Sequence, residues 1–288
     1  MGVNLAGADM QIAKDVIAGR TKLTVEEIQK LIAGVTNLYA EKPNIVETPS
    51  QNTIYVGDLH GNLMSTQAIR DTFLKSPEYS LVFLGDYADR GMNQIETFNL
   101  VISMAIQHPK RVLMLRGNHE SKMVARMYGF YDVVKSQYST KLFDNYCEVF
   151  KALPLAGLSS SGVFCCHGGV PEGVRSREQI LSIDRHSIDL ENPIAFQLVW
   201  NDPVEADFHF GSNMRGGGTR TFGRLAFSEF VKNLGIRLMI RAHEVFQNGY
   251  KRFFEGKLIS VFSTPYNGRV SPKVIRLQDD LIAEAVPI

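Results

Sequence analysis

The first fifty residues carry the spacing of an amphipathic helix. Thr24 and Glu27 stand at the spacing of a capping box, and apolar residues then recur every three or four positions (Ile28, Leu31, Ile32, Val35 and Leu38). Pro43 and Pro49 follow, and the residue before a proline disfavours the helical conformation. The pattern therefore predicts a helix after Thr24 and a linker between the two prolines.

From residue 53 the pattern changes to short apolar runs that suit buried strands. Each run ends in a polar cluster, and most are separated by stretches of helix length. The runs cover residues 53–56, 81–84, 112–115, 163–166, 237–240 and 258–262. Strands that alternate with helices are typical of βαβ units, so the sequence predicts an α/β sandwich. We expect a single domain over residues 1–288, with the helical segment and linker of residues 1–50 packed on it.

Five of these runs end in clusters that are rich in glycine, histidine and carboxylate or amide side chains. The clusters cover residues 57–62, 85–91, 116–120, 167–169 and 241–244, and they hold four of the seven histidines. In α/β folds, ligands bind at the carboxyl ends of the strands. Carboxylate, amide and imidazole groups without a thiolate suit Mn²⁺, Fe or Zn²⁺. The arrangement predicts a metal site.

Each cluster taken alone has a simpler interpretation. A lone aspartate after a strand, such as Asp58, usually caps a helix or forms a turn. A lone buried histidine, such as His167 or His243, is more often a hydrogen-bonded core residue. Asp89 and Arg90 could form a structural ion pair. Five clusters with metal-ligand residue types at successive strand ends favour one shared site over five separate structural roles.

Composition and charge narrow the range of functions. Lysine plus arginine (31) nearly balances aspartate plus glutamate (30), and no basic stripe appears, so nucleic acid is not an expected partner. Three cysteines cannot form a disulfide framework. The sequence shows no apolar signal core and no uninterrupted membrane-length apolar stretch, so we expect a soluble, cytoplasmic protein without a membrane partner. We also expect five methionines to pack in the protein interior and not to form a binding surface: Met104, Met114, Met123, Met127 and Met239.

Three motifs follow the first three strands. They are Gly-Asp-x-His-Gly at 57–61, Gly-Asp-x-x-Asp-Arg-Gly at 85–91 and Gly-Asn-His-Glu at 117–120. In their order and spacing the chain resembles the PPP family of metal-dependent protein serine/threonine phosphatases, from about Thr24 to about Gly268. Other metallophosphoesterases share these motifs, which specify the chemistry. The segments that resemble the protein-phosphatase branch are 128–132, 164–169, 200–203 and 241–244.

The resemblance implies a metallophosphoesterase-type α/β sandwich, with two mixed sheets flanked by helices and two divalent metal ions at the strand carboxyl ends. One ion would be held by Asp58 and His60, the other by Asn118, His167 and His243, and Asp86 would bridge them. Mn²⁺ is the favoured ion, and Fe or Zn²⁺ are alternatives. A hydroxide that bridges such a pair would attack phosphorus directly, without a phosphoenzyme.

The resemblance also implies roles for the residues around the metals. His119 would be the general acid that protonates the leaving oxygen, and Asp89 would orient its ring. Arg90 and Arg215 would clamp the phosphate, because guanidinium groups match phosphate oxygens.

Two parts of the chain depart from the family pattern. The segment around Arg215 has about one residue more than usual, so Arg220 stays an alternative for the second clamp. Tyr266 is the candidate for the tyrosine that the family places over the metals. Its loop is one residue shorter than the corresponding loop of the family.

The predicted function is the hydrolysis of phosphoserine and phosphothreonine monoesters in proteins, with phosphotyrosine as a side activity. A nucleotide or dinucleoside-polyphosphate hydrolase is an alternative, because the same metal motifs serve both. A metal-bearing interaction module without catalysis is another. The expected partners are phosphoprotein substrates. The sequence does not decide whether a regulatory or targeting protein selects these substrates.

Overall fold

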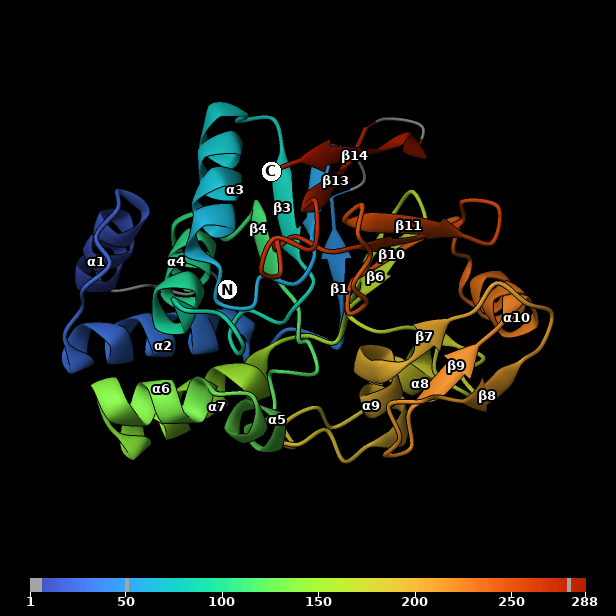
Figure 1. Cartoon of the computed structure of the whole chain (residues 1–288), viewed down its shortest axis with the longest axis horizontal. Helices are drawn as coiled ribbons and strands as arrows, with labels where there is room; N and C mark the ends of the chain where they lie inside the picture. The colour runs from blue at the N-terminus through green and yellow to red at the C-terminus, as the bar shows by residue number, and fades with distance from the viewer. Residues whose placement is uncertain (1–6, 50–51, 279–280) are drawn as a thin grey trace.

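The computed structural model describes residues 7–49, 52–278 and 281–288, in which helices and strands alternate along the chain (Figure 1). The helices are α1 (Gly7–Ile17), α2 (Val25–Tyr39), α3 (Leu63–Lys75), α4 (Gln94–Gln107), α5 (Lys122–Met127), α6 (Phe130–Gln137), α7 (Thr140–Ala152), α8 (Arg177–Leu181), α9 (Pro193–Trp200) and α10 (Arg224–Leu234). The strands are β1 (Ile45–Thr48), β2 (Thr53–Val56), β3 (Ser80–Phe83), β4 (Val112–Met114), β5 (Ala156–Ser159), β6 (Val163–Cys166), β7 (Asp202–Pro203), β8 (Phe210–Ser212), β9 (Arg220–Phe222), β10 (Leu238–Arg241), β11 (Tyr250–Phe253), β12 (Leu258–Val261), β13 (Lys273–Leu277) and β14 (Ala283–Pro287).

Two mixed β-sheets pack against each other in the centre of the molecule. One has the strand order β14-β13-β2-β3-β4, in which β2, β3 and β4 are parallel. The other has the order β1-β5-β6-β10-β12-β11, in which β6, β10 and β12 are parallel. Apolar side chains from both sheets, such as Tyr55, Val82, Cys165 and Ile240, form one buried cluster. The predicted α/β sandwich is confirmed.

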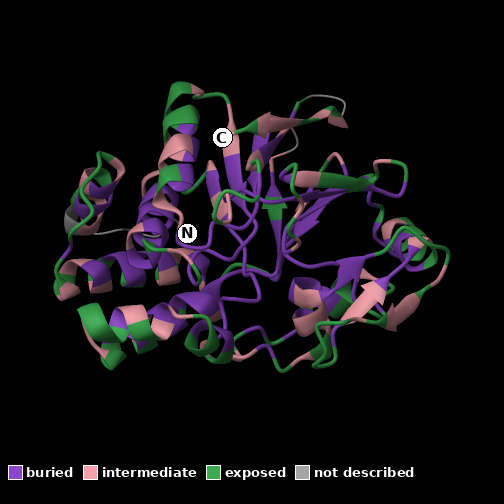
Figure 2. Cartoon of the chain, viewed as in Figure 1, coloured by how far each residue is buried: buried purple, intermediate pink, exposed green. Residues whose placement is uncertain are grey.

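Helices cover the outer faces of both sheets (Figure 1). Those of the first half of the chain lie on the five-stranded sheet, where Phe83 of β3 and Phe98 of α4 belong to the same buried cluster. Helices α8, α9 and α10 lie on the six-stranded sheet, together with the small sheet β7-β9-β8. The central strands are therefore buried, whereas the outer helix surfaces are exposed (Figure 2).

The N-terminal helix is confirmed, but the predicted linker contains a strand. Thr24 and Glu27 form a reciprocal capping box at the start of α2. Strand β1 lies between the two prolines and pairs in parallel with β5 at the edge of the six-stranded sheet. The backbone N–H of Met114 in β4 donates to the Tyr39 hydroxyl at the end of α2, 2.9 Å away. Residues 1–6 and 50 of the predicted N-terminal segment lie outside the described residues.

The six predicted strands are all present, with bounds that move by at most one residue. Met104, Met114 and Met239 are buried, as predicted. The prediction is wrong for Met123 and Met127, which stand four residues apart on the outward face of α5 and are 58% and 70% exposed. No helix in the described part of the chain is both long enough and apolar enough to cross a membrane.

Candidate active site

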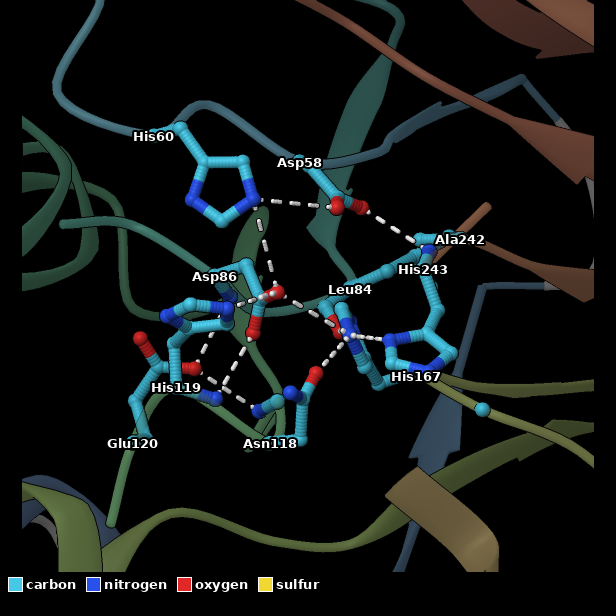
Figure 3. Close-up of polar contacts among 12 residues, drawn as sticks. Asp58, His60, Leu84, Asp86, Asn118, His119, Glu120, His167, Ala242 and His243 are labelled. Atoms are coloured by element: carbon cyan, nitrogen blue, oxygen red, sulfur yellow. Dashed lines mark hydrogen bonds and ion pairs between the residues drawn. The ribbon is translucent and has the colours of Figure 1, made fainter. Parts of the chain in front are cut away.

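The carboxyl ends of strands from both sheets bring the predicted metal ligands into one cluster (Figure 3). The five-stranded sheet supplies Asp58 and His60 after β2, Asp86 after β3 and Asn118 after β4; the six-stranded sheet supplies His167 after β6 and His243 after β10. All six residues are buried. A pocket of about 330 Å³ is lined by five of them, and His167 does not line it.

The turns after the strands hold several of these residues in the left-handed backbone region, which residues other than glycine rarely adopt. The φ angles are 43° for His60, 57° for Asp86 and 73° for His243. Such conformations cost on the order of 1–3 kcal/mol each and are typical of functional sites. Gly117 lets the turn after β4 pass close to the cluster, because a Cβ atom there would lie 2.2 Å from Oδ1 of Asp86.

Four acceptor atoms converge at the junction of the two sheets. Nε2 of His167 lies 2.8 Å from Oδ1 of Asn118, 3.2 Å from Nδ1 of His243 and 3.3 Å from Oδ2 of Asp86. Nδ1–H of His167 donates to the carbonyl oxygen of Leu84 at 3.0 Å, so Nε2 of the neutral ring presents a lone pair to the other three atoms. Acceptors that face one another repel unless a cation lies between them. This donor set fits a divalent ion.

A second set of acceptors adjoins the first and shares Asp86 with it. Nδ1–H of His60 donates to the carbonyl oxygen of Ala88 at 3.0 Å. Its Nε2 therefore faces Oδ2 of Asp58 at 3.4 Å and Oδ2 of Asp86 at 3.8 Å. The other oxygen of Asp58 accepts the backbone N–H of His243 at 2.9 Å. The described residues thus fit two neighbouring cations that share one carboxylate.

The electrostatics of the cluster favour an anionic Asp86 and a neutral His243. Burial opposes ionisation of Asp86, but the charges of His167 and His119 outweigh it and hold the pKa of this carboxyl well below its usual value. Burial lowers the pKa of His60, yet the hydrogen bond with Asp58 and the charge of Asp86 raise it overall. Burial and the nearby Arg215 hold the pKa of His243 well below its usual value. Asp86 is therefore anionic and His243 neutral at neutral pH.

His119 points at the same cluster but has a different partner. Its Nδ1 lies 2.6 Å from Oδ2 of Asp89, and Oδ1 of Asp89 accepts the backbone N–H of Phe130 at 2.8 Å. Nε2 of His119 lies 3.8 Å from Oδ2 of Asp86, on the pocket wall. By distance alone, His60, Asp86 and His119 could hold an ion. The geometry therefore permits His119 to act as a ligand or as a proton donor.

Arg90 stands at the pocket mouth between two tyrosines. Its guanidinium carbon lies 4.7 Å from the centre of the Tyr128 ring. Nη1 of Arg90 donates to the Tyr266 hydroxyl at 2.7 Å. All three residues line the pocket, so the two tyrosines fix the position of the guanidinium group there.

Arg215 lines the same pocket, whereas Arg220 does not. Nε of Arg215 donates to Oδ2 of Asp202 at 2.7 Å, and the other oxygen of Asp202 accepts from the buried Arg241 at 3.0 Å. Arg220 pairs with Glu172, 3.4 Å away. Of the two candidates for the second clamp, Arg215 is the one placed beside the cluster.

A comparison with known families agrees with this geometry. The family model for calcineurin-like phosphoesterases matches residues 52–247, a range that contains all six candidate metal ligands. The chain belongs to the calcineurin-like phosphoesterase family.

Two solved structures illustrate the relationships of this phosphoesterase. A protein serine/threonine phosphatase from Saccharomyces cerevisiae, with similarity to human phosphatase PP5, is 29% identical to it with a TM-score of 0.83, covering 92% of this chain and 90% of that chain. A cold-active protein-tyrosine phosphatase of the psychrophile Shewanella sp. is 16% identical with a TM-score of 0.61, covering 87% of this chain and 84% of that chain. The second likeness shows a common fold. The chain is a metallophosphoesterase, and divalent metals are the cofactors that this fold implies.

Sequence reasoning gave no role to Glu120 of the phosphoesterase. Its carboxylate accepts the backbone N–H groups of Asp86 at 2.8 Å, Tyr87 at 3.1 Å and Gly117 at 2.8 Å. It therefore joins the turns after β3 and β4, which carry the shared ligand Asp86 and the ligand Asn118 (Figure 3). Burial and the nearby charge of Asp86 raise the pKa of Glu120 to about 7, although the N–H donors favour the anion. The sequence signal that could have indicated this role is the position of Glu120 at the end of the Gly-Asn-His-Glu motif.

Proposed function

We propose that this phosphoesterase is a protein phosphatase that hydrolyses phosphoserine and phosphothreonine monoesters. The observation that carries the proposal is one pocket that combines acceptor sets for two cations, two arginines and a buried histidine–aspartate pair. The likeness to the yeast serine/threonine phosphatase, which extends over nearly the whole chain, supports the choice of substrate class.

The two acceptor sets would hold two divalent ions. Asp58 and His60 would bind one ion, Asn118, His167 and His243 would bind the other, and Asp86 would be shared. When bound, such a pair supplies Lewis acidity and a water molecule of lowered pKa as the nucleophile. Mn²⁺ is the ion we favour, with Fe or Zn²⁺ as alternatives, because the ligands are oxygen and nitrogen atoms without sulfur.

Arg90 and Arg215 would bind the phosphate oxygens. A guanidinium group presents paired N–H donors that match two phosphate oxygens. Tyr266 holds Arg90, and Asp202 holds Arg215, so both groups are oriented before the substrate arrives. They would stabilise the charge on the equatorial oxygens in the transition state.

His119 would protonate the leaving serine or threonine oxygen. When the ring carries a proton on both nitrogens, Nδ1–H is directed to Asp89, and the proton on Nε2, which faces the pocket, is the transferable one. A protonated Nε2 cannot bind a cation, and Asp58, His60 and Asp86 already form a ligand set without it. Protonation of such a poor leaving group contributes typically ~10²–10⁴-fold to the rate.

A substrate panel tests the proposal. The chain is freed of metal with a chelator, reconstituted with Mn²⁺, Fe²⁺ or Zn²⁺, and given matched phosphoserine, phosphothreonine and phosphotyrosine peptides and a dinucleoside polyphosphate. We expect higher kcat/KM for the phosphoserine and phosphothreonine peptides than for the other two. A preference for the dinucleoside polyphosphate would assign the chain to nucleotide hydrolysis instead. Two bound ions without turnover of any substrate would indicate an interaction module.

A further inference from the structure

The sequence holds two Asn-Gly dipeptides, Asn248-Gly249 and Asn267-Gly268. In such a pair the side-chain amide of asparagine can react with the backbone nitrogen of glycine, because glycine has no side chain to hinder the approach. The reaction needs a backbone N–H that is not held in a hydrogen bond and a peptide that is free to rotate. The surroundings of the two pairs in the fold decide which of them reacts.

The pair Asn248-Gly249 is held on all sides. The N–H of Gly249 donates to the carbonyl oxygen of Phe246 at 2.8 Å, and the carbonyl oxygen of Gly249 accepts the N–H of Phe262 at 2.8 Å. Gly249 is buried, and a Cβ atom there would overlap the carbonyl oxygen of Ser271. Its nitrogen is therefore engaged, and packing keeps the peptide from rotating.

The pair Asn267-Gly268 stands at the tip of the loop between β12 and β13. Two backbone hydrogen bonds close the loop below the tip, from Val270 to Pro265 at 3.0 Å and from Arg269 to Tyr266 at 3.3 Å. Both residues of the pair are exposed, and the Gly268 N–H makes no hydrogen bond to the described part of the chain. A side chain at Gly268 would meet open space, so packing leaves this peptide free to rotate.

We infer that Asn267 is a site of spontaneous deamidation. The backbone nitrogen of Gly268 forms a bond with Cγ of Asn267 while the Cγ–Nδ2 bond breaks, and ammonia leaves with the proton of the former N–H. The product is a cyclic succinimide. Water then adds to either ring carbonyl carbon and breaks its bond to the nitrogen. Residue 267 becomes aspartate or isoaspartate, and water is the only co-reactant.

The modification lies next to a contact of the catalytic pocket, and this consequence rests on the proposed function. Tyr266, the residue before Asn267, accepts the hydrogen bond from Arg90 at 2.7 Å. Aspartate adds a negative charge to the loop, and isoaspartate also lengthens its backbone by one atom, so both products displace the Tyr266 hydroxyl. We expect loss of that hydrogen bond to weaken the binding of inorganic phosphate about fivefold.

The test follows both asparagines by peptide mapping with mass spectrometry while the metal-loaded chain is kept in mildly alkaline buffer. We expect Asn267 to convert at least about fivefold faster than Asn248, since attack at Gly249 first requires the loss of one hydrogen bond. In urea that unfolds the chain, the two rates should converge. The inhibition constant for phosphate, measured with p-nitrophenyl phosphate, should rise about fivefold in step with the conversion of Asn267.

Two variants at position 267 serve as references for this time course. Asn267→Asp carries the negative charge from the start, so we expect its phosphate binding to be weak before any incubation. Asn267→Gly lacks the reactive amide and tolerates the φ of 59° at this position. We expect its inhibition constant to stay unchanged throughout the incubation.

Equal conversion of the two asparagines in the folded chain, or a difference that persists in urea, would overturn the assignment of Asn267. Full conversion without a change in the inhibition constant, or an equal drift in Asn267→Gly, would overturn its effect on the pocket. Failure of the proposed function is seen separately, as the absence of phosphopeptide hydrolysis, because the conversion rates are read by mass and do not depend on the substrate class.

Discussion

Nδ1 of His119 lies 2.6 Å from Oδ2 of Asp89, and both side chains are buried. A hydrogen bond of this length between an imidazole and a carboxylate is typical of a charge-assisted pair. Asp89 therefore stabilises positive charge on the ring and fixes its orientation, while Nε2 stays directed toward the pocket. This pair is the basis of the proposed proton-donor role of His119.

Replacement Asp89→Asn removes the charge from this pair and preserves its size. We expect turnover of phosphoserine peptides to fall by ~10² or more, with metal content unchanged. The loss should be smaller for p-nitrophenyl phosphate, because nitrophenolate leaves without much help from an acid. Steady-state kinetics on both substrates, with metal analysis in parallel, checks this. Equal losses on the two substrates would argue for a structural role of Asp89.

Replacement Gly117→Ala places a methyl group against the shared carboxylate. The added Cβ would lie 2.2 Å from Oδ1 of Asp86, so the carboxylate or the turn after β4 must move. We expect the variant to bind fewer ions and to lose about 10²-fold in kcat, the order of effect of a 1 Å displacement. Metal analysis of the folded variant measures this, with circular dichroism as the control for folding. Wild-type metal content together with wild-type turnover would contradict the close approach.

The hydroxyl of Tyr266 orients Arg90. Tyr266→Phe keeps the ring but removes the acceptor of the 2.7 Å hydrogen bond from Nη1. Loss of one such bond costs about 1 kcal/mol, which corresponds to roughly fivefold in kcat/KM and in the affinity for inorganic phosphate as an inhibitor. Tyr250→Phe, a substitution in β11 outside the pocket, is the control. If both variants behave alike, Tyr266 does not position the arginine.

The hydroxyl of Tyr39 joins the N-terminal helices to the five-stranded sheet. It accepts the buried backbone N–H of Met114, which Tyr39→Phe would leave without a partner. We expect the free energy of unfolding to fall by about 1–3 kcal/mol in urea denaturation. Tyr131→Phe is the control, since its hydroxyl makes no hydrogen bond to any of residues 7–49, 52–278 or 281–288. An unchanged midpoint for Tyr39→Phe would show that the bond does not contribute.

The central strands and the residues that follow them could be predicted because each signal is local. The run 163–166 and the histidine after it, for example, stand together in the sequence and in the structure. Strand β1 was missed because it is four residues long between two prolines, and its partner β5 lies more than a hundred residues further along the chain. A pattern within the segment does not show such a pairing.

In the candidate site, too, some features are predicted by the local sequence and others depend on the fold. The sequence placed the ligand residues at strand ends, but it left Arg220 as an alternative to Arg215 because this segment has about one residue more than the family pattern. Only the fold shows that Arg215 binds Asp202 beside the pocket, whereas Arg220 pairs with Glu172. The exposure of Met127 was equally hidden, since it depends on which face of α5 turns outward.

The metal stoichiometry of the Asp86→Asn variant, measured beside that of the unchanged chain, decides whether one carboxylate serves two cations. Asp86 is the carboxylate that both acceptor sets share, and Asp71→Asn, on the exposed side of α3, is the matched control. We predict two divalent ions per unchanged or control chain after reconstitution, and loss of at least one ion with nearly all phosphatase activity in Asp86→Asn. Two ions bound as tightly by Asp86→Asn, or full activity of the chelated chain, would contradict the account.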